Sequence, residues 1–400
     1  MNILFVTPRL LYPVNRGDKV RPYNFAKILA KKHNLSLLSF IQTKDELQYV
    51  EPLKEFFSSV DTIYLPAWKS KLKMGLNILS GEPLQVSYFK DNRFDEKISE
   101  ILARKRIDVV YIFHLRMAQY FIKRNNTYRV LDLCDTVSFF MGRLLKHARW
   151  YMKPIYAYEI SKVKKYEQQL MDYFEEYWII SKEDKDALES NQKFSNIQII
   201  PNGVDVEYFK NTEDGSGRKS IIFVGYMGVE SIDAVFFFYD KILPIVRKEV
   251  PEVLFYIVGA NPPDKIKALE KDKNIIVTGF VEDLREYYKK ASVAIAPMRF
   301  VAGMQNKILE AMSMSLPVVS TFYGNEGINA KDGESIFVAD DPKCFAQRVI
   351  QILDDGDLKK KMGNNARKFI EENYSWNRVF DRVEEIERNV TNSVNWRRSF

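Results

Sequence analysis

The chain has 400 residues, of which 46% are hydrophobic and 28% are charged. This length exceeds one compact core and suits two domains of a globular protein. No apolar run reaches the roughly 18 residues that would span a bilayer. Pro8 and Arg9 interrupt the first apolar stretch, which argues against a secretory signal.

The cysteines and histidines limit the compartment and the chemistry. Cys134 and Cys344 lie far apart without a CxxC partner, which argues against a disulfide framework and fits a reducing compartment. The three histidines are scattered, which argues against a zinc site. We therefore expect a cytoplasmic protein.

The net charge of +7 is unevenly distributed. Residues 1–200 carry 32 Lys and Arg against 23 Asp and Glu, whereas residues 201–400 carry 28 against 30. A basic half attracts nucleic acid, anionic lipid headgroups or phosphorylated small molecules. We find no recognition motif or aromatic platform for nucleic acid, so we expect no such partner.

The first half alternates short β-branched runs with helical stretches, which is typical of βα units and a parallel sheet. Helices are expected from about Asp18 to Lys32, with Phe25, Ile28 and Leu29 on one face, and over 155–174. The strands are expected at 3–8, 35–40, 62–67, 108–113, 129–135, 176–181 and 197–201.

The series restarts after a polar, glycine-containing segment at 211–220, which is predicted to be a linker or surface turn. Near-continuous apolar runs indicate parallel strands that are covered on both faces. We expect two doubly wound domains, whose ligands bind beyond the carboxyl ends of the strands. The strands of this half are expected at 220–225, 253–259, 274–279, 293–298, 316–321 and 335–339.

The most informative segment runs from Arg299 to Met314. A strand is expected to end at Met298, a loop to follow, and a helix to begin near Gln305. Free N–H groups at such a helix start can hold a phosphate. Lys307 and Glu310 are three residues apart, so they share one helix face, where the cation suits a diphosphate and the carboxylate suits two ribose hydroxyls. The same pattern also fits a strand–loop–helix unit with a salt-bridged surface pair.

Residues 306–321 resemble the donor-site signature of retaining glycosyltransferase family 4, closest to the exopolysaccharide transferases associated with exosortase systems. Further blocks that resemble the family occur in the same order along nearly the whole chain. The resemblance implies a GT-B architecture, in which two Rossmann-like domains face each other across a cleft and a C-terminal helix crosses back to the first domain. The blocks are 17–23, 80–89, 129–135, 201–205, 277–288 and 374–376.

The resemblance implies these domain ranges and site residues. We expect an acceptor domain at 1–203, a donor domain at 204–373, and a returning helix at 374–400. The expected catalytic residues are His114, Arg299 and Lys307. The expected donor-binding residues are Gly17, Gly259, Val281, Gly303, Met304, Gln305, Asn306 and Glu310, and the expected acceptor-binding residues are Arg16, Arg21 and Asp135.

Some of these residues have an alternative structural interpretation. His114 follows a strand and could serve only the fold, and Asp135 could cap the helix that follows it. Arg16 and Arg21 could be solvent-facing residues of an ordinary βα connection.

Two departures from the family pattern concern the donor. The family often has a second glutamate eight residues before Glu310, and this chain has Ala302 there. The backbone amides of 303–305 would then have to recognise the donor sugar. The stretch 224–234 lacks the Arg and Lys that many relatives place there. Arg299 and Lys307 are the expected replacements.

The expected reaction moves a glycosyl group from a UDP- or GDP-sugar to a hydroxyl of a glycan or lipid-linked acceptor, with retention of configuration. No Asp-x-Asp motif stands in a suitable loop, so we expect neither a metal nor a cofactor. The mixture of lysines and apolar residues at 68–79 suggests contact with the inner face of the cytoplasmic membrane, although a solvated basic surface fits equally. A non-catalytic nucleotide-sugar-binding subunit and a GT-B-fold epimerase stay as alternatives.

Overall fold

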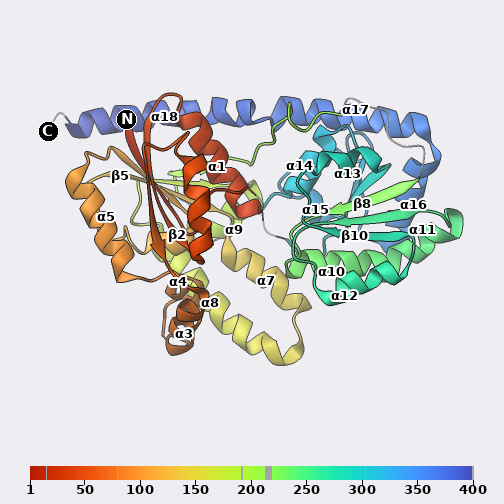
Figure 1. Cartoon of the computed structure of the whole chain (residues 1–400), viewed down its shortest axis with the longest axis horizontal. Helices are drawn as coiled ribbons and strands as arrows, with labels where there is room; N and C mark the ends of the chain where they lie inside the picture. Colours follow the sequence, from red (N-terminus) through yellow and green to blue (C-terminus); the bar gives the residue numbers. More distant parts are fainter. Residues whose placement is uncertain (15, 79, 191, 212–218, 302, 399–400) are drawn as a thin grey trace. The chain divides into compact units, whose positions relative to one another are not determined.

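The computed structural model describes residues 1–398 except 15, 79, 191, 212–218 and 302 (Figure 1). The chain divides into two compact units. Unit 1 comprises Met1–Ile200 and Arg382–Phe400, and unit 2 comprises Pro201–Asp381. Residues 212–218 of the predicted linker at 211–220 lie outside the described residues. The acceptor and donor roles assigned to the two halves stay predictions.

Unit 1 is built on a parallel seven-stranded sheet of order β3-β2-β1-β4-β5-β6-β7. The central strands β1, β4 and β5 are buried almost throughout because helices cover both faces of the sheet, as their continuous apolar runs predict. The strands are β1 (Asn2–Thr7), β2 (Asn34–Ile41), β3 (Ser59–Tyr64), β4 (Val109–Phe113), β5 (Tyr128–Cys134), β6 (Glu176–Ile179) and β7 (Ile197–Ile199).

The helices of unit 1 include the two that the sequence predicts, from about Asp18 to Lys32 and over 155–174. The first ends at Leu29, earlier than expected, because residues 30–33 turn back into β2. The helices are α1 (Gly17–Leu29), η1 (Lys44–Tyr49), α2 (Val50–Leu53), α3 (Ala67–Leu76), α4 (Leu84–Tyr88), α5 (Asn92–Arg104), α6 (Leu115–Ala118), α7 (Val137–His147), η2 (Trp150–Met152), α8 (Lys153–Leu170) and α9 (Lys182–Leu188).

Unit 2 repeats the design with a parallel six-stranded sheet of order β10-β9-β8-β11-β12-β13. The prediction of two doubly wound parallel-sheet units is confirmed. The strands are β8 (Ser220–Val224), β9 (Leu254–Val258), β10 (Ile275–Gly279), β11 (Val293–Ala296), β12 (Val318–Ser320) and β13 (Phe337–Val338).

The helices of unit 2 lead into a long C-terminal helix that ends in unit 1, as predicted. Within unit 1, this helix is held by an ion pair between Lys32 and Glu384. The helices are α10 (Val229–Phe237), η3 (Phe238–Ile242), α11 (Leu243–Glu249), α12 (Asp264–Lys267), η4 (Ala268–Lys271), α13 (Arg285–Lys290), α14 (Asn306–Ser313), α15 (Phe322–Asn325), α16 (Pro342–Asp354), α17 (Gly356–Asn373) and α18 (Trp376–Arg398).

Each sheet has one point where the strand order reverses. In unit 1 this switch point lies between β1 and β4, and in unit 2 it lies between β8 and β11. The connections after the two strands leave toward opposite faces of the sheet, so a crevice opens between them at the carboxyl ends. Most of the predicted site residues lie in segments that follow β1, β4 or β11, and the others follow β5, β9 or β10.

Candidate functional site

The crevice of unit 2 depends on a very close approach of two glycine loops. Gly225 follows β8 and donates its N–H to the carbonyl of Val258 at 2.9 Å. A Cβ atom on Gly259 would lie 1.8 Å from the carbonyl oxygen of Gly225, so only glycine fits there. The backbone of this edge is therefore packed tightly next to the start of α14.

The segment after β11 delivers the start of α14 to this edge. Gly303 adopts a φ of 53°, and the helix begins at Asn306, one residue after the predicted start. The side chain of Gln305 makes no capping hydrogen bond, and the first N–H groups of a helix have no partner within the helix, so this end can accept a ligand. The Asn306 side chain is held by Asn202, which donates to its Oδ1 at 2.9 Å.

Lys307 is a partly buried cation at the start of this helix. Its Nζ lies 4.4 Å from the centroid of the Phe223 ring and 3.8 Å from Met298 Sδ. Burial lowers the pKa of Lys307 to about 8, against the opposing charges of Glu230 and Glu310. A cation without a close carboxylate in the described part of the chain is suited to an anionic ligand.

Glu310 lies one turn further along α14 and is partly buried as well. Tyr288 of α13 donates its hydroxyl to Glu310 Oε2 at 3.0 Å. Burial raises the pKa of Glu310 to about 7, although the Tyr288 hydrogen bond and Lys307 both act to lower it. The tyrosine thus fixes one carboxylate oxygen and leaves the other for a ligand.

Arg299 is held by a carboxylate that the sequence analysis missed. Its Nε donates to Asp233 Oδ2 at 2.8 Å, and the guanidinium lies 5.3 Å from the centroid of the Phe237 ring. This hydrogen bond raises the pKa of Arg299. The stretch 224–234 therefore supplies an acid that partly neutralises Arg299, which leaves Lys307 as the less neutralised cation. Ala302 lies outside the described residues.

The two residues predicted to meet a nucleobase lie at neighbouring strand ends. Gly259 follows β9, and Val281 follows β10 after Gly279, whose φ is 68°. Phe280 lies between Gly279 and Val281 in the loop after β10, and its side chain is 63% exposed. An exposed aromatic ring directly after a strand is a signal that the sequence analysis could have used.

His114 occupies the corresponding edge in unit 1, directly after β4. It has a φ of 73°, and its N–H donates to the carbonyl of Asp132 at 2.7 Å. The ring is buried, and its Nδ1 has no hydrogen-bond partner within the described residues. Burial and the charges of Arg116 and Arg9 lower its pKa well below the usual value, so the ring is neutral at physiological pH. A non-glycine residue held in this backbone region is a feature of functional sites.

Arg21 lies in the interior of unit 1 and not at an accessible edge. It is 1% exposed, its Nε donates to Asp132 Oδ2 at 2.7 Å, and its Nη1 donates to the carbonyl of Ile200. Tyr111 donates its hydroxyl to the same carboxylate. This burial argues against direct contact with an acceptor, because the guanidinium already serves an internal network.

The other predicted residues of unit 1 follow β1 and β5. Gly17 is the first residue of α1, and Arg16 Nε lies 3.4 Å from Asp18 Oδ1. Burial, followed by the charge of Asp184, raises the pKa of Asp135 to about 7. The alternative role of Asp135 as a helix cap is wrong, because Thr136 is the N-cap of α7.

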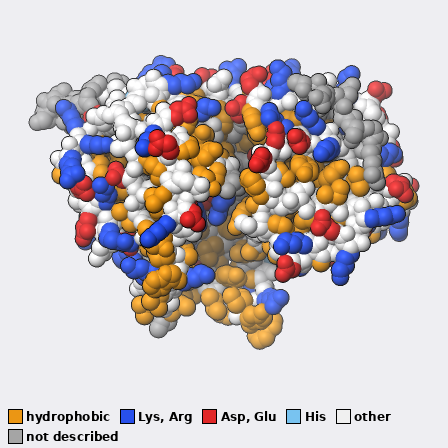
Figure 2. All heavy atoms as spheres, in the orientation of Figure 1, with side chains coloured by type: hydrophobic (Ala, Val, Ile, Leu, Met, Phe, Trp, Pro, Cys, Tyr) orange, Lys and Arg blue, Asp and Glu red, His pale blue; other side chains and the backbone are white. Residues whose placement is uncertain are grey.

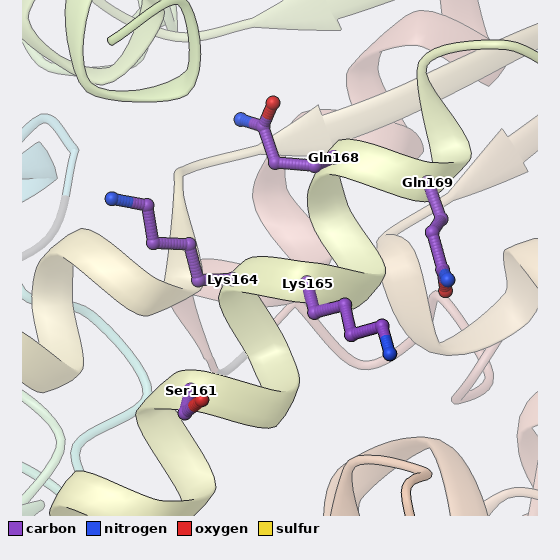
Figure 3. A pocket seen from close by; sticks show the side chains of 5 residues that line it. All are labelled: Ser161, Lys164, Lys165, Gln168 and Gln169. Atoms are coloured by element: carbon purple, nitrogen blue, oxygen red, sulfur yellow. The ribbon is translucent and has the colours of Figure 1, made fainter. Parts of the chain in front are cut away.

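A surface hollow lies along α8 and is lined by polar and charged residues. Figure 3 shows that its labelled side chains come from one helix and point in different directions. They do not converge on one point, so this hollow lacks the geometry of a small-molecule site. The lining residues are Ser161, Lys164, Lys165, Gln168 and Gln169.

The described residues hold no group of three or more His, Cys, Asp or Glu side chains arranged to bind a metal. None of their helices is both long and apolar enough to cross a bilayer.

One family model matches a range within unit 2. Residues 218–355 match the family model described as Glycosyl transferases group 1. This range contains Lys307 and Glu310.

Two curated relatives and one solved structure extend the comparison. An uncharacterized 44.6 kDa protein in the cps region of Klebsiella pneumoniae is 25% identical over 95% of this chain and 98% of its own length. The UDP-Gal:alpha-D-GlcNAc-diphosphoundecaprenol alpha-1,3-galactosyltransferase of Escherichia coli is 26% identical over 48% of this chain and 53% of its own length. Anabaena HepE in complex with UDP and glucose superimposes with a TM-score of 0.71 and 13% identity, over 97% of this chain and 100% of that one. At this identity the structural likeness shows a shared fold.

Proposed function

We propose that this chain, a glycosyltransferase with the two-domain GT-B fold, moves a hexosyl group from a nucleotide sugar to a lipid-linked or growing polysaccharide. The observation that carries the proposal is the start of α14 within the matched range, where a Cβ on Gly225 in the loop after β8 would lie 3.1 Å from Lys307 Nζ, and Glu310 lies one turn further along the helix. The structure of HepE holds UDP and glucose on the same fold, which supports a UDP-sugar donor.

Lys307 and the start of α14 hold the donor diphosphate in this proposal. The amides of Gly303 to Asn306 and the helix dipole favour negative charge at that point. Charge builds up on the leaving diphosphate as the glycosyl bond breaks, and preorganised positive groups stabilise it. Arg299 contributes less than Lys307, because Asp233 already neutralises part of its charge.

Glu310 and the strand-end loops hold the nucleoside. The free oxygen of Glu310 accepts ribose hydroxyls, while Tyr288 keeps the carboxylate in position. Gly259 and Val281 offer backbone groups to the base, and the exposed ring of Phe280 offers a stacking surface.

The transfer proceeds with retention of configuration and without a metal. The departing phosphate takes the proton of the acceptor hydroxyl on the same face of the sugar. His114 is neutral, so it serves by hydrogen bonding to a sugar or acceptor hydroxyl and not as a charged acid. Arg16 and Asp135 contact the acceptor.

The acceptor is lipid-linked in this proposal. One relative comes from a cps region, and another acts on a sugar linked to diphosphoundecaprenol. The narrower likeness to exosortase-associated transferases depends on the sequence blocks alone.

A two-part surface of unit 1 supports work at the cytoplasmic face of a membrane. Figure 2 shows hydrophobic side chains gathered over α3 and over η2 and the first turns of α8. Trp68 and Leu76 are 67% and 78% exposed in the first part, and Trp150 is 83% exposed in the second. The segments 62–81 and 136–158 contain three and four Lys or Arg and no Asp or Glu. Exposed aromatic rings among unopposed cations are suited to an anionic lipid surface.

Vesicle binding tests this surface. A Trp68→Ser and Trp150→Ser double variant should lose most co-sedimentation with phosphatidylglycerol vesicles, and Phe322→Ser, an exposed ring of unit 2, should bind as wild type. Equal sedimentation of the double variant and the wild type would refute the membrane contact.

Product analysis tests the reaction. The protein is incubated with labelled UDP- and GDP-sugars and a bacterial lipid extract, and the lipid and soluble fractions are then separated. Label in a lipid-linked glycan supports the transferase, and the anomeric configuration of the product tests retention. An isomerised nucleotide sugar would indicate an epimerase, and binding without any product would indicate a non-catalytic subunit.

A further inference from the structure

The crevice of unit 1 contains a cluster of cations that the proposed roles above leave unused. Arg9 lies two residues beyond β1, and Arg116 lies in α6, three residues beyond β4. Their guanidinium carbons each lie 5.8 Å from the centroid of the Phe89 ring. Side chains from both sides of the strand-order reversal therefore meet around one ring.

We propose that Arg9 and Arg116 form a binding site for a phosphate group of the acceptor, within the crevice between β1 and β4. This inference rests on the proposed function only in taking the phosphate to belong to the acceptor substrate. The site itself is defined by its position, its charge and its hydrogen-bonding groups.

Arg116 is the central residue, because it lacks a counter-charge. Its Nε donates to the neutral Gln85 Oε1 at 3.0 Å, and no carboxylate lies within 4 Å of it in the described parts of the chain. Burial and then the charge of Arg9 lower the pKa of Arg116 to about 10. A partly buried guanidinium in this state gains stability from an anion, and its planar fork can donate two parallel hydrogen bonds to phosphate.

The surrounding charges also leave an excess of cations. Arg9 pairs with Asp18 at 2.7 Å, and Arg16 lies 3.4 Å from the same carboxylate. Lys19 is buried beside them, and burial lowers its pKa. Glu46 and Asp135 act on Lys19 and Arg116 from a longer distance. Such an excess would be costly for folding alone, and it is explained by a bound anion.

His114 adds a polar atom without adding charge. Its buried Nδ1 lacks a partner in the described structure and lies at the end of β4, two residues from Arg116. A neutral imidazole nitrogen can form one hydrogen bond to a phosphate oxygen or to the sugar hydroxyl beside it. The crevice thus offers one neutral nitrogen and two guanidinium groups.

The competing explanation is that Arg9 and Arg116 only stack on Phe89. Stacking needs the cation but no anionic ligand, so a direct binding measurement separates the two explanations. Saturating UDP is added first, because it occupies the donor site of unit 2 and keeps phosphate away from Lys307.

The experiment titrates the full-length, UDP-saturated protein with sn-glycerol 1-phosphate and, separately, with vesicles that contain phosphatidic acid, by calorimetry. We expect wild type to bind glycerol phosphate, Arg116→Ala to lose at least about tenfold in affinity, and Arg116→Lys to lose less. The matched control Arg104→Ala, an exposed arginine of α5, should bind as wild type. If the protein binds the vesicles but not glycerol phosphate, and Arg116→Ala weakens that vesicle binding, the phosphate belongs to a lipid headgroup.

Two results would overturn the site. One is the absence of phosphate binding by UDP-saturated wild type in both forms, and the other is equal affinity in wild type and Arg116→Ala. A folded Arg116→Ala protein, checked by a circular dichroism spectrum and a thermal unfolding curve like those of wild type, excludes loss of structure as the cause. If phosphate binding depends on Arg116 but no sugar transfer is found, the site stands and the proposed function fails.

Discussion

The two strand-order reversals of this protein share a topology but differ in chemistry. Between β8 and β11, the crevice of unit 2 combines one weakly neutralised cation, Lys307, with a carboxylate, Glu310, that a tyrosine positions. Between β1 and β4, the crevice of unit 1 combines two arginines around one ring with a neutral histidine. The fold provides two equivalent places for ligands, and the side chains at the strand ends decide which ligand each can hold.

The largest expected effect follows from removing the cation of unit 2. Lys307→Ala should cost about 2–4 kcal/mol of transition-state stabilisation, or roughly 30- to 900-fold in turnover, because the leaving diphosphate loses its closest cation. Steady-state kinetics with a labelled donor measure the loss, and Lys248→Ala, at an exposed position of α11, is the control. Wild-type turnover in a folded Lys307→Ala protein would show that Lys307 does not stabilise the leaving diphosphate, and the proposed donor role of the unit 2 crevice would fail.

A smaller effect is expected from Glu310. Glu310→Gln should weaken UDP binding about tenfold without any acceptor present, because an amide replaces the charged acceptor of the ribose hydroxyls. Calorimetric titration with UDP is the measurement, and Glu286→Gln on the exposed side of α13 is the control. Arg116→Ala in unit 1 should leave this affinity unchanged. If Glu310→Gln binds UDP as wild type, Glu310 is a structural residue.

The pH dependence of UDP affinity should reveal both groups of unit 2. Glu310 has a raised pKa of about 7, so its carboxylate form is lost as the pH falls below 7. Lys307 has a lowered pKa of about 8, so its charge is lost as the pH rises above 8. The affinity should therefore be greatest between about pH 7 and 8 and fall several-fold on either side.

Matched variants assign the two limbs of this profile. Glu310→Gln should remove the acidic limb, and Lys307→Arg should move the alkaline limb beyond the measured range, because arginine keeps its charge. Limbs that persist unchanged in both variants would belong to other groups.

The smallest expected effect is that of a chelator. Turnover should be unchanged in excess EDTA, because Lys307, Arg299 and the start of α14 supply positive charge to the diphosphate. The rate is measured with and without EDTA and after addition of magnesium or manganese. Loss of turnover with EDTA and its recovery with either ion would contradict this account.

The sequence predicted the sheets because their strands are buried on both faces. Continuous apolar runs such as those of β8 and β11 require cover from two layers of helices, and this requirement can be read without coordinates. The start of α14 near Gln305 was predicted for a similar reason, since the loop and the helical spacing are both local. The roles of the site residues stay predictions.

Pairings between distant residues could not be read in this way. Arg299 and Asp233 are 66 positions apart, and Arg21 and Asp132 are 111 apart, so neither ion pair has a local signature. The first partly neutralises a predicted catalytic cation, and the second buries a predicted acceptor residue. Both outcomes depend on which strands become neighbours in the sheet.

The sequence by itself therefore determined the two parallel sheets, the order of their elements and the start of the helix at the donor motif. Local hydrophobic periodicity and helix-start chemistry act over a few residues, so they survive in a single sequence. Only the tertiary structure decided which charges are neutralised, which are buried, and that Arg9 and Arg116 meet at Phe89. The reason is physical, since the ionisation of a side chain depends on its burial and on nearby charges, and the fold brings those together from distant positions.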